Sequence, residues 1–263
     1  MSETTELQPP VDVVEKSKSF SETGHAKNIA NFETIVTFAT SYGTAYNPVR
    51  AALKLPALQA QLTAAKTSLT AVNAAVPAYS NAIAAREVAF APLSKLITRV
   101  MNAVKASDTT VNVDENARTI ARKIQGVRAT PKKSEEAKKA LDAEGKEVNE
   151  VSSSQMSYDN RLDNLDKLIK LLSSIPLYAP NEAELKIAAL TTYYNDLKAK
   201  NAAVIATSAP LSNARITRND IMYKDTTGMC DIAIDVKSYI KSLYGASSPQ
   251  YKQISGLKFT QVR

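Results

Sequence analysis

Apolar side chains recur at alternating spacings of three and four residues along most of this chain, a pattern that predicts amphipathic helices with heptad seams. The longest series begins after Pro48 and stays in phase across Pro77 and Pro92. Its members are Leu55, Leu58, Leu62, Ala65, Leu69, Val72, Val76, Tyr79, Ile83, Arg86, Phe90, Leu93, Ile97, Val100 and Val104. The series predicts either one helix of about 60 residues, kinked by its prolines, or a hairpin at Pro77, and we favour the kinked helix.

Shorter elements are predicted on both sides of this series. A first helix should begin near Ser21 or Thr23, whose side chains can cap its free amides, and should end at Gly43. Between Thr109 and Thr130 we expect irregular chain around a short helix at about 115–124.

Two further series predict the helices of the second half. A strict heptad pattern over 134–174 predicts one rod of about 40 residues. The next series opens at Pro180 and should end at Tyr244 and Gly245. It crosses Thr207–Pro210, which is more turn-like than the chain around Pro77.

The sequence also contains an internal repeat. The stretch Tyr46–Ser107 aligns without a gap on Tyr178–Tyr239, and 17 of the 62 aligned positions are identical. Each residue of the first copy is separated from its counterpart by the same number of positions along the chain, the number that separates Tyr46 from Tyr178. We call this separation the repeat offset. The shared pairs include Tyr46/Tyr178, Pro48/Pro180, Leu53/Leu185, Lys54/Lys186, Leu58/Leu190, Val72/Val204 and Arg86/Arg218. Because chance gives far fewer identities even in an alanine-rich chain, we interpret the protein as a tandem duplication.

These patterns predict an all-α protein, an elongated antiparallel bundle of long kinked helices in two units related by a pseudo-twofold. Few aromatic residues, no tryptophan and only seven glycines also favour helix over sheet. We divide the chain into an acidic tail that is disordered or loosely docked, a first helical repeat ending in a basic strip, a charged helical connector, and a second repeat ending in a basic strip. Their ranges are 1–22, 23–130, 131–154 and 155–263.

Composition indicates the compartment. Cys230 is the single cysteine, which excludes an internal disulfide. The polar, acidic N-terminus lacks the regions of a signal peptide. The longest uncharged run, Thr67–Ala85, contains Asn73 and Pro77 and falls short of a spanning helix. We therefore expect a cytoplasmic protein, with leaderless export left open.

Few residues suit catalysis. His25 is the single histidine, so a Ser-His-Asp or Cys-His catalyst would depend on it alone. The seven glycines form neither the GxxxxGK[ST] nor the GxGxxG phosphate-binding motif. Carboxylates cluster at Asp159, Asp163 and Asp166, where a solvated helix face is the simplest interpretation. We expect no enzyme activity, no metal site and no cofactor, and we identify no small-molecule substrate.

Two arginines stand at seam positions that are otherwise apolar. Arg86 and Arg218 occupy the same place in the two copies. Each guanidinium either extends along its stem into solvent or makes a buried polar contact that fixes the register of the helices, with Asn81 and Asn213 as candidate partners.

Each repeat ends in a small basic element of the pattern basic-x-Ile-x-Gly-apolar-basic-x-Thr. Its alternation predicts a short extended segment with the apolar face down and the charges outward. These elements either pack along their own bundle or form two docking strips for an anionic partner. The candidate strip residues are Arg122, Lys123, Gly126, Arg128, Lys252, Gly256 and Lys258.

The predicted function is structural. We expect a scaffold that self-associates, or docks on a protein partner, through long helical surfaces and the two basic strips. An alternative is a membrane-active bundle, similar to α-helical pore-forming toxins, that inserts Thr67–Ala85. A third is a protein that binds an anionic polymer, with nucleic acid disfavoured because few aromatic side chains could stack on bases.

Overall fold

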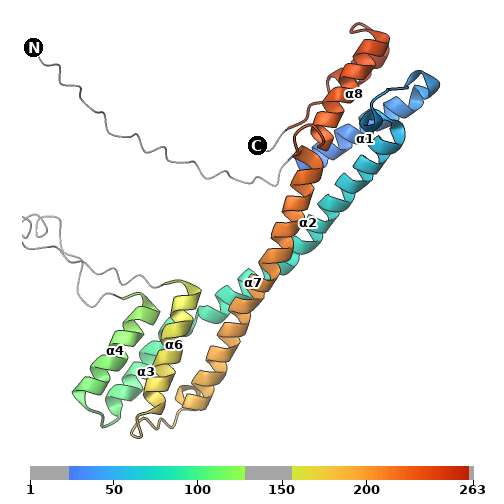
Figure 1. The fold of residues 1–263 in the computed structure, drawn as a ribbon. Helices are drawn as coiled ribbons and strands as arrows, with labels where there is room; N and C mark the ends of the chain where they lie inside the picture. The colour runs from blue at the N-terminus through green and yellow to red at the C-terminus, as the bar shows by residue number, and fades with distance from the viewer. Residues whose placement is uncertain (1–23, 128–155, 261–263) are drawn as a thin grey trace, which may run out of the picture. The chain divides into compact units, whose positions relative to one another are not determined.

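The computed structural model describes residues 24–127 and 156–260, and these residues form helices and turns without any strand (Figure 1). The α-helices are α1 (His25–Ser41), α2 (Leu55–Phe90), α3 (Leu93–Ala106), α4 (Val111–Gln125), α6 (Tyr158–Ser173), α7 (Ile187–Tyr223), α8 (Met229–Tyr244) and α9 (Pro249–Ser255). Short 3-10 turns lie at Gly43–Ala45, Ala51–Leu53 and Ala183–Leu185. The predicted all-α class is therefore confirmed for the described residues.

The two longest helices, α2 and α7, each contain a proline, Pro77 and Pro210. The helix continues through both, so the hairpin alternative at Pro77 is wrong. An interior proline costs about 3 kcal/mol, in part because the carbonyl four residues earlier loses its N–H donor. Both prolines occupy exposed positions, where water can bond that carbonyl. Seam residues near the two prolines, such as Val72 and Leu211, are buried.

Two breaks interrupt helices that the heptad series predict as continuous. The predicted helix of about 60 residues is two helices, because α2 ends at Phe90 and α3 begins at Leu93. In the second half, α7 ends at Tyr223 and α8 begins at Met229, after a turn in which Thr226 has a φ of 65°. A heptad series indicates which positions are buried and does not indicate where a helix ends. Phe90, Leu93 and Met229, which lie at the two breaks, are all buried. Periodicity alone therefore does not reveal the breaks.

The predicted rod over 134–174 is not continuous either. Ser157 lies outside α6, and its hydroxyl accepts a hydrogen bond from the N–H of Asn160 as a helix cap. The helix therefore begins at Tyr158, and residues 134–155 lie outside the described part of the chain.

Other helix ends differ by smaller amounts. Helix α4 covers the whole of Val111–Gln125, where a shorter helix in irregular chain is predicted. Helix α1 follows Gly24, which has a φ of 93°, whereas Ser21 and Thr23 lie outside the described residues. The predicted end of the last long series at Tyr244 is confirmed.

The chain forms two compact units, unit 1 from Met1–Thr70 with Ile216–Arg263, and unit 2 from Ala71–Arg215. In its described part, unit 1 has a core of side chains from α1, the start of α2, the end of α7, and α8 and α9. Unit 2 has its own core from the end of α2, α3, α4, α6 and the start of α7. The largest fully buried side chains are Phe32, Ile35, Leu58 and Met222 in unit 1, and Leu93, Ile97, Ile124, Leu165, Leu168, Leu172, Leu190 and Leu197 in unit 2.

The segments that precede α2 and α7 are anchored in the same way. The Tyr46 hydroxyl donates a hydrogen bond of 2.7 Å to the carbonyl of Leu53, and the Tyr178 hydroxyl donates one of 2.8 Å to the carbonyl of Leu185. The repeat offset separates the two tyrosines and also the two leucines. Tyr46 holds its segment in unit 1, and Tyr178 does so in unit 2.

A second pair of contacts follows the same spacing. In unit 1 the side-chain amide of Gln61 donates to the carbonyl of Ile221 at 2.8 Å. In unit 2 the Tyr193 hydroxyl donates to the carbonyl of Ala89 at 2.7 Å. The repeat offset separates Gln61 from Tyr193 and Ala89 from Ile221. Different side chains therefore make the same link between α2 and α7 at equivalent positions of the two repeats.

Candidate functional site

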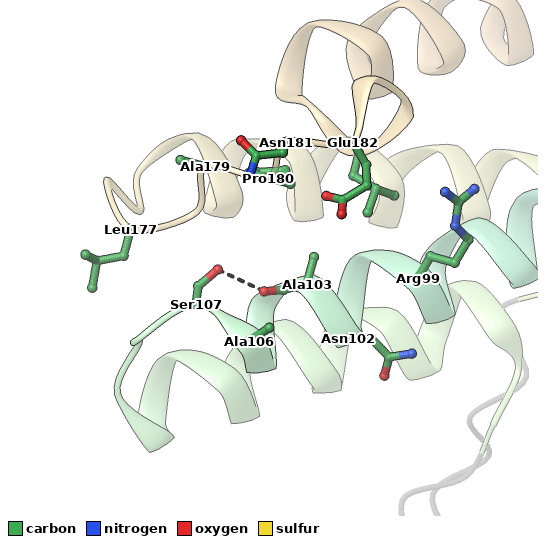
Figure 2. Close-up of a pocket in the computed structure, with 11 residues that line it drawn as sticks. Arg99, Asn102, Ala103, Ala106, Ser107, Leu177, Ala179, Pro180, Asn181 and Glu182 are labelled. Atoms are coloured by element: carbon green, nitrogen blue, oxygen red, sulfur yellow. Dashed lines mark hydrogen bonds between the residues drawn. The ribbon is translucent and has the colours of Figure 1, made fainter.

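A groove in unit 2 lies between α3 and the segment that precedes α7 (Figure 2). It encloses about 650 Å³, a volume in the range of ligand pockets. Its lining residues are Arg99, Asn102, Ala103, Ala106, Ser107, Leu177, Ala179, Pro180, Asn181, Glu182 and Leu185. We call this the first groove.

The lining of the first groove changes from charged to apolar along its length. Figure 2 shows Arg99 toward one end and Leu177 at the other, and Leu177 is 57% exposed. Arg99 forms an ion pair with Glu184, next to the groove. The Ser107 hydroxyl donates to the carbonyl of Ala103 at 2.8 Å, and no lining residue could act as its base except Glu182. This lining suits docking of another molecule better than nucleophilic catalysis.

A second groove lies in unit 1 and encloses about 420 Å³. It is lined by Arg50, Thr226, Asp231, Ile234 and Asp235. Arg50 forms an ion pair with Asp235 and donates from Nη2 to the carbonyl of Thr226 at 3.3 Å. A carboxylate oxygen of Asp231 accepts the N–H of Thr226 at 2.8 Å, which fixes the turn before α8.

The two grooves have corresponding linings. Pairs of lining residues that are separated by the repeat offset are Arg50 and Glu182, Arg99 and Asp231, Asn102 and Ile234, and Ala103 and Asp235. The same place on each unit therefore forms a groove, with different side chains. Sequence reasoning missed both grooves, because they need a pre-helix segment and a helix from different parts of the chain.

The seam arginine of unit 2, Arg86, contacts partners that the sequence did not predict. Its Nη1 donates to Oδ1 of Asn201 at 3.1 Å, and its guanidinium lies 3.9 Å from the ring centre of Tyr158. Asn201 is buried and donates in turn to Asp159 at 2.8 Å. This network joins α2, α6 and α7 within unit 2.

The remaining members of the predicted polar seam differ among themselves. Arg218 is buried in unit 1, and its Nε and Nη2 donate to Oδ1 of the neighbouring Asn219 at 3.1 and 3.0 Å. Asn81 and Asn213 are exposed. The hydrogen bond of Arg86 goes to Asn201 rather than to either of these two. The register-fixing role of the seam stays a prediction.

The first basic strip is helical up to Gln125, so its predicted extended conformation is wrong there. Arg122 and Lys123 lie in the last turn of α4, where cations stabilise the helix end. Gly126 ends the helix with a φ of 70°, and a Cβ atom there would lie 2.4 Å from the sulfur of Met156. Arg128 lies outside the described residues.

The second strip is also helical at its start, since Lys252 lies in α9 and Gly256 follows its end. Beyond it, Leu257 and Phe259 pack against the core of unit 1, whereas Lys258 is exposed. The predicted alternation of apolar and basic faces is therefore confirmed for these last residues. Whether either strip docks an anionic partner stays a prediction.

Two buried asparagines of α1 hold the end of the second strip. The Asn28 side chain donates to the carbonyl of Thr260 at 2.7 Å and accepts the N–H of Thr260 at 3.0 Å. Asn31 donates to the carbonyl of Lys258 at 2.7 Å. Both asparagines follow the spacing of the α1 seam, and their polarity at buried positions was the available signal that sequence reasoning did not use.

The only histidine and the only cysteine of the chain are buried in the same unit. His25 Nδ1 lies 2.6 Å from the Tyr223 hydroxyl, which also accepts a bond of 3.3 Å from Asn28. Burial raises the pKa of the Cys230 thiol to about 12, with a smaller contribution from the negative charge of Asp231. A thiol with this pKa is a poor nucleophile at neutral pH.

Two further sequence predictions concern metals and membranes. Within residues 24–127 and 156–260, no group of three or more His, Cys, Asp or Glu side chains could hold a metal ion. The uncharged run Thr67–Ala85 lies inside α2. No helix of the described chain is both long and apolar enough to cross a bilayer.

The described residues thus form an all-helical protein with one groove on each unit. The sequence matches no protein-family model, and neither the curated proteins nor the solved structures give a significant match.

Proposed function

We propose that this protein is a non-enzymatic scaffold that associates with further copies of itself, and that its sequence arose by tandem duplication. In this proposal each compact unit joins the N-terminal half of one repeat to the C-terminal half of the other. The repeat offset recurs in the tyrosine anchors, in the links between α2 and α7 and in the groove linings, and this recurrence supports the duplication. The elongated shape and the pseudo-twofold stay predictions from the sequence.

The observation that carries the proposal is the charge of the grooves. The first groove is lined by one positive and one negative side chain, Arg99 and Glu182, and a second anion, Glu184, lies beside it in an ion pair with Arg99. The second groove is lined by one positive and two negative side chains, Arg50, Asp231 and Asp235. The second groove therefore has an acidic excess in its lining, and the first has one when Glu184 at its edge is included, on a chain whose net charge is +7.

The basic strips fit these grooves in charge. Lys123, Lys252 and Lys258 are exposed, and the first strip adds an exposed apolar residue, Val127. The first groove offers the exposed Leu177 as an apolar partner, and the second offers Ile234, which is 49% exposed. The first strip of one copy can thus meet a groove of the next through opposite charges and a small apolar contact, and the second strip can do so through its charges.

Two strips and two grooves on one chain make the contact multivalent. A strip-to-groove contact uses different surfaces on the two copies, so repeated contacts extend an assembly unless the geometry closes it into a ring. Each exposed ion pair is weak, about 0.2–1 kcal/mol, but linked contacts raise the overall affinity. A scaffold that assembles at high local concentration is the function that these surfaces support best.

The test measures self-association by light scattering and size-exclusion chromatography over a range of protein and salt concentrations. Assembly should weaken as salt rises, because exposed charges are screened. Replacing the strip charges Arg122, Lys123, Arg128, Lys252 and Lys258 with Gln should lower association and flatten its salt dependence. Circular dichroism should show unchanged helix content, because exposed charges contribute little to stability.

A matched variant replaces five exposed lysines away from the strips, Lys27, Lys54, Lys95, Lys186 and Lys224, with Gln. It changes net charge equally and should retain more association than the strip variant. On the groove side, Leu177→Ser with Glu182→Gln should weaken association, whereas Val88→Ser, at a position 74% exposed outside the grooves, should not. A parent protein that stays monomeric at every concentration, and captures no neighbour in a pull-down, contradicts the proposal.

A further inference from the structure

The ion pairs beside the two grooves are reversed in sign. In unit 2, helix α3 supplies the cation Arg99 and the segment before α7 supplies the anion Glu184. In unit 1, the segment before α2 supplies the cation Arg50 and helix α8 supplies the anion Asp235. Each ion pair joins a pre-helix segment to a helix. The segment carries the cation in unit 1 and the anion in unit 2.

The reversal is confined to positions where the two repeats differ. Lysines at equivalent places, such as Lys54 with Lys186 and Lys105 with Lys237, are the same in both repeats and cannot distinguish them. The charges that differ lie in or beside the grooves. In the alignment of the two repeats, Arg50 corresponds to Glu182, Ala52 to Glu184, Arg99 to Asp231, and Ala103 to Asp235.

The reversed ion pairs matter because their cations and their anions come from different repeats. Arg50 and Arg99 both lie in the first repeat, and Glu184 and Asp235 both lie in the second. Each observed ion pair therefore joins one repeat to the other. If a repeat closed on itself, the pre-helix segment would meet the helix of its own repeat. In the second repeat, Glu184 would then lie opposite Asp231 and Glu182 opposite Asp235, so like charges would meet. In the first repeat, Arg50 and Arg99 would line one groove without their anions.

We propose that Arg50, Arg99, Glu184 and Asp235 determine which half-repeats pair. They direct each half-repeat to the opposite repeat and disfavour closure of a repeat on itself. The inference rests on the duplication in the proposed function but does not require self-association. Attraction at an exposed pair, and repulsion between like charges in its place, are both weak effects that add together. Each groove therefore changes the ratio of correct to self-closed pairing by about threefold to tenfold.

The test uses the full chain with Cys230→Ala and two reporter cysteines. Ala106 and Ala179 both line the first groove, so A106C with A179C reports correct pairing. Ser238 follows Ala106 by the repeat offset, so A179C with S238C reports self-closure of the second repeat. Each reporter chain is unfolded in urea, refolded at high dilution and treated with a short bis-maleimide, and the cross-linked fraction is measured by mass spectrometry.

Three versions of each reporter are compared. The parent sets the baseline, R99E with E184R inverts the ion pair, and R99Q with E184Q removes it. The net charge is the same in all three. Inversion keeps an ion pair in the correct groove, but places a cation where the second repeat would meet Asp231. The inverted version should raise the ratio of self-closure to correct cross-link by about fivefold over the parent, because it turns the repulsion in the self-closed form into an ion pair. The neutral version should raise the ratio by a similar factor, because it loses both the ion pair of the correct form and the repulsion of the self-closed form.

An unchanged ratio in the inverted version overturns the proposal, and so does a rise in the neutral version alone. If the inverted chain has lost helix by circular dichroism, the second groove decides with R50E and D235R. Its reporters are N47C with S238C for correct pairing and A179C with S238C for self-closure of the second repeat, where D235R would meet Glu182. Because cross-linking is done on dilute chains, the result does not depend on whether the parent assembles.

Discussion

The hydroxyls of Tyr46 and Tyr178 give the sharpest test of the equivalence between the two units. Each phenol is nearly buried, with 5% and 6% of its surface exposed, and donates to a main-chain carbonyl seven residues later. Burial raises the pKa of both phenols, that of Tyr178 to about 12, with a smaller contribution from Glu182 at Tyr178 and from Tyr239 at Tyr46. Replacing either tyrosine with Phe should have the same consequence in its own unit.

At neutral pH each Tyr→Phe substitution should cost about 1 kcal/mol, because a buried carbonyl loses its donor. Alkaline pH should remove this difference. The folded phenol has the higher pKa, so its contribution to stability is fully present below the unfolded pKa of about 10 and is lost as pH rises from there toward about 12. The Phe variant has no phenol, so its stability does not fall through this ionisation.

The crossing point follows from the linkage. At about pH 11 ionisation of the unfolded phenol stabilises the unfolded parent by about 1.4 kcal/mol, which exceeds the hydrogen bond. Parent and Tyr178→Phe should therefore be equally stable near pH 10.7, give or take about half a unit. Lysine deprotonation affects both proteins alike and cancels in the difference.

The assay is urea unfolding followed by circular dichroism at several pH values between about 7 and 11. Tyr79→Phe is the control, since the Tyr79 hydroxyl has no hydrogen bond within the described chain, and it should change stability little at neutral pH. If the gap between parent and Tyr178→Phe stayed constant over this range, the phenol would titrate equally in both states and the reasoning would be refuted. A large effect at one tyrosine and none at the other would argue against equivalent anchors.

Two other substitutions test the polar contacts. Arg86→Met should cost about 1–2 kcal/mol, because it removes the contact with Tyr158 and leaves the buried Asn201 without its donor, while the exposed Asn81→Ala should be neutral or slightly stabilising; equal effects in urea unfolding would contradict the network. Asn28→Ala should release residues 257–260 from α1 and speed amide exchange of Thr260 by about tenfold or more, whereas Asn213→Ala should not, and unchanged exchange in hydrogen–deuterium experiments would show that the asparagine does not hold the strip.

The fold was predictable as far as periodic burial determines it. Seam residues such as Leu58 and Leu190 are buried as their spacing predicts, and helices follow because a spacing of three and four puts them on one face. The breaks after Phe90 and Tyr223 were not predictable in this way. A short turn can leave the residues on both sides buried, so the series continues where the helix does not.

The candidate site was less predictable, because it depends on which segments meet. Arg86 was recognisable as a polar residue at an apolar seam position, but its partner Asn201 is 115 residues away and depends on tertiary packing. The charged residues of the grooves show more clearly that a contact cannot be predicted from sequence when it depends on which segments meet. In the alignment of the repeats, Arg50 opposite Glu182 counts as one mismatch among many. Only when Arg50 is found beside Asp235, in the other repeat, does the mismatch become a complementary pair. In a duplicated chain, the positions that have diverged are therefore where contacts between the copies should be sought, because identical surfaces cannot tell one copy from the other.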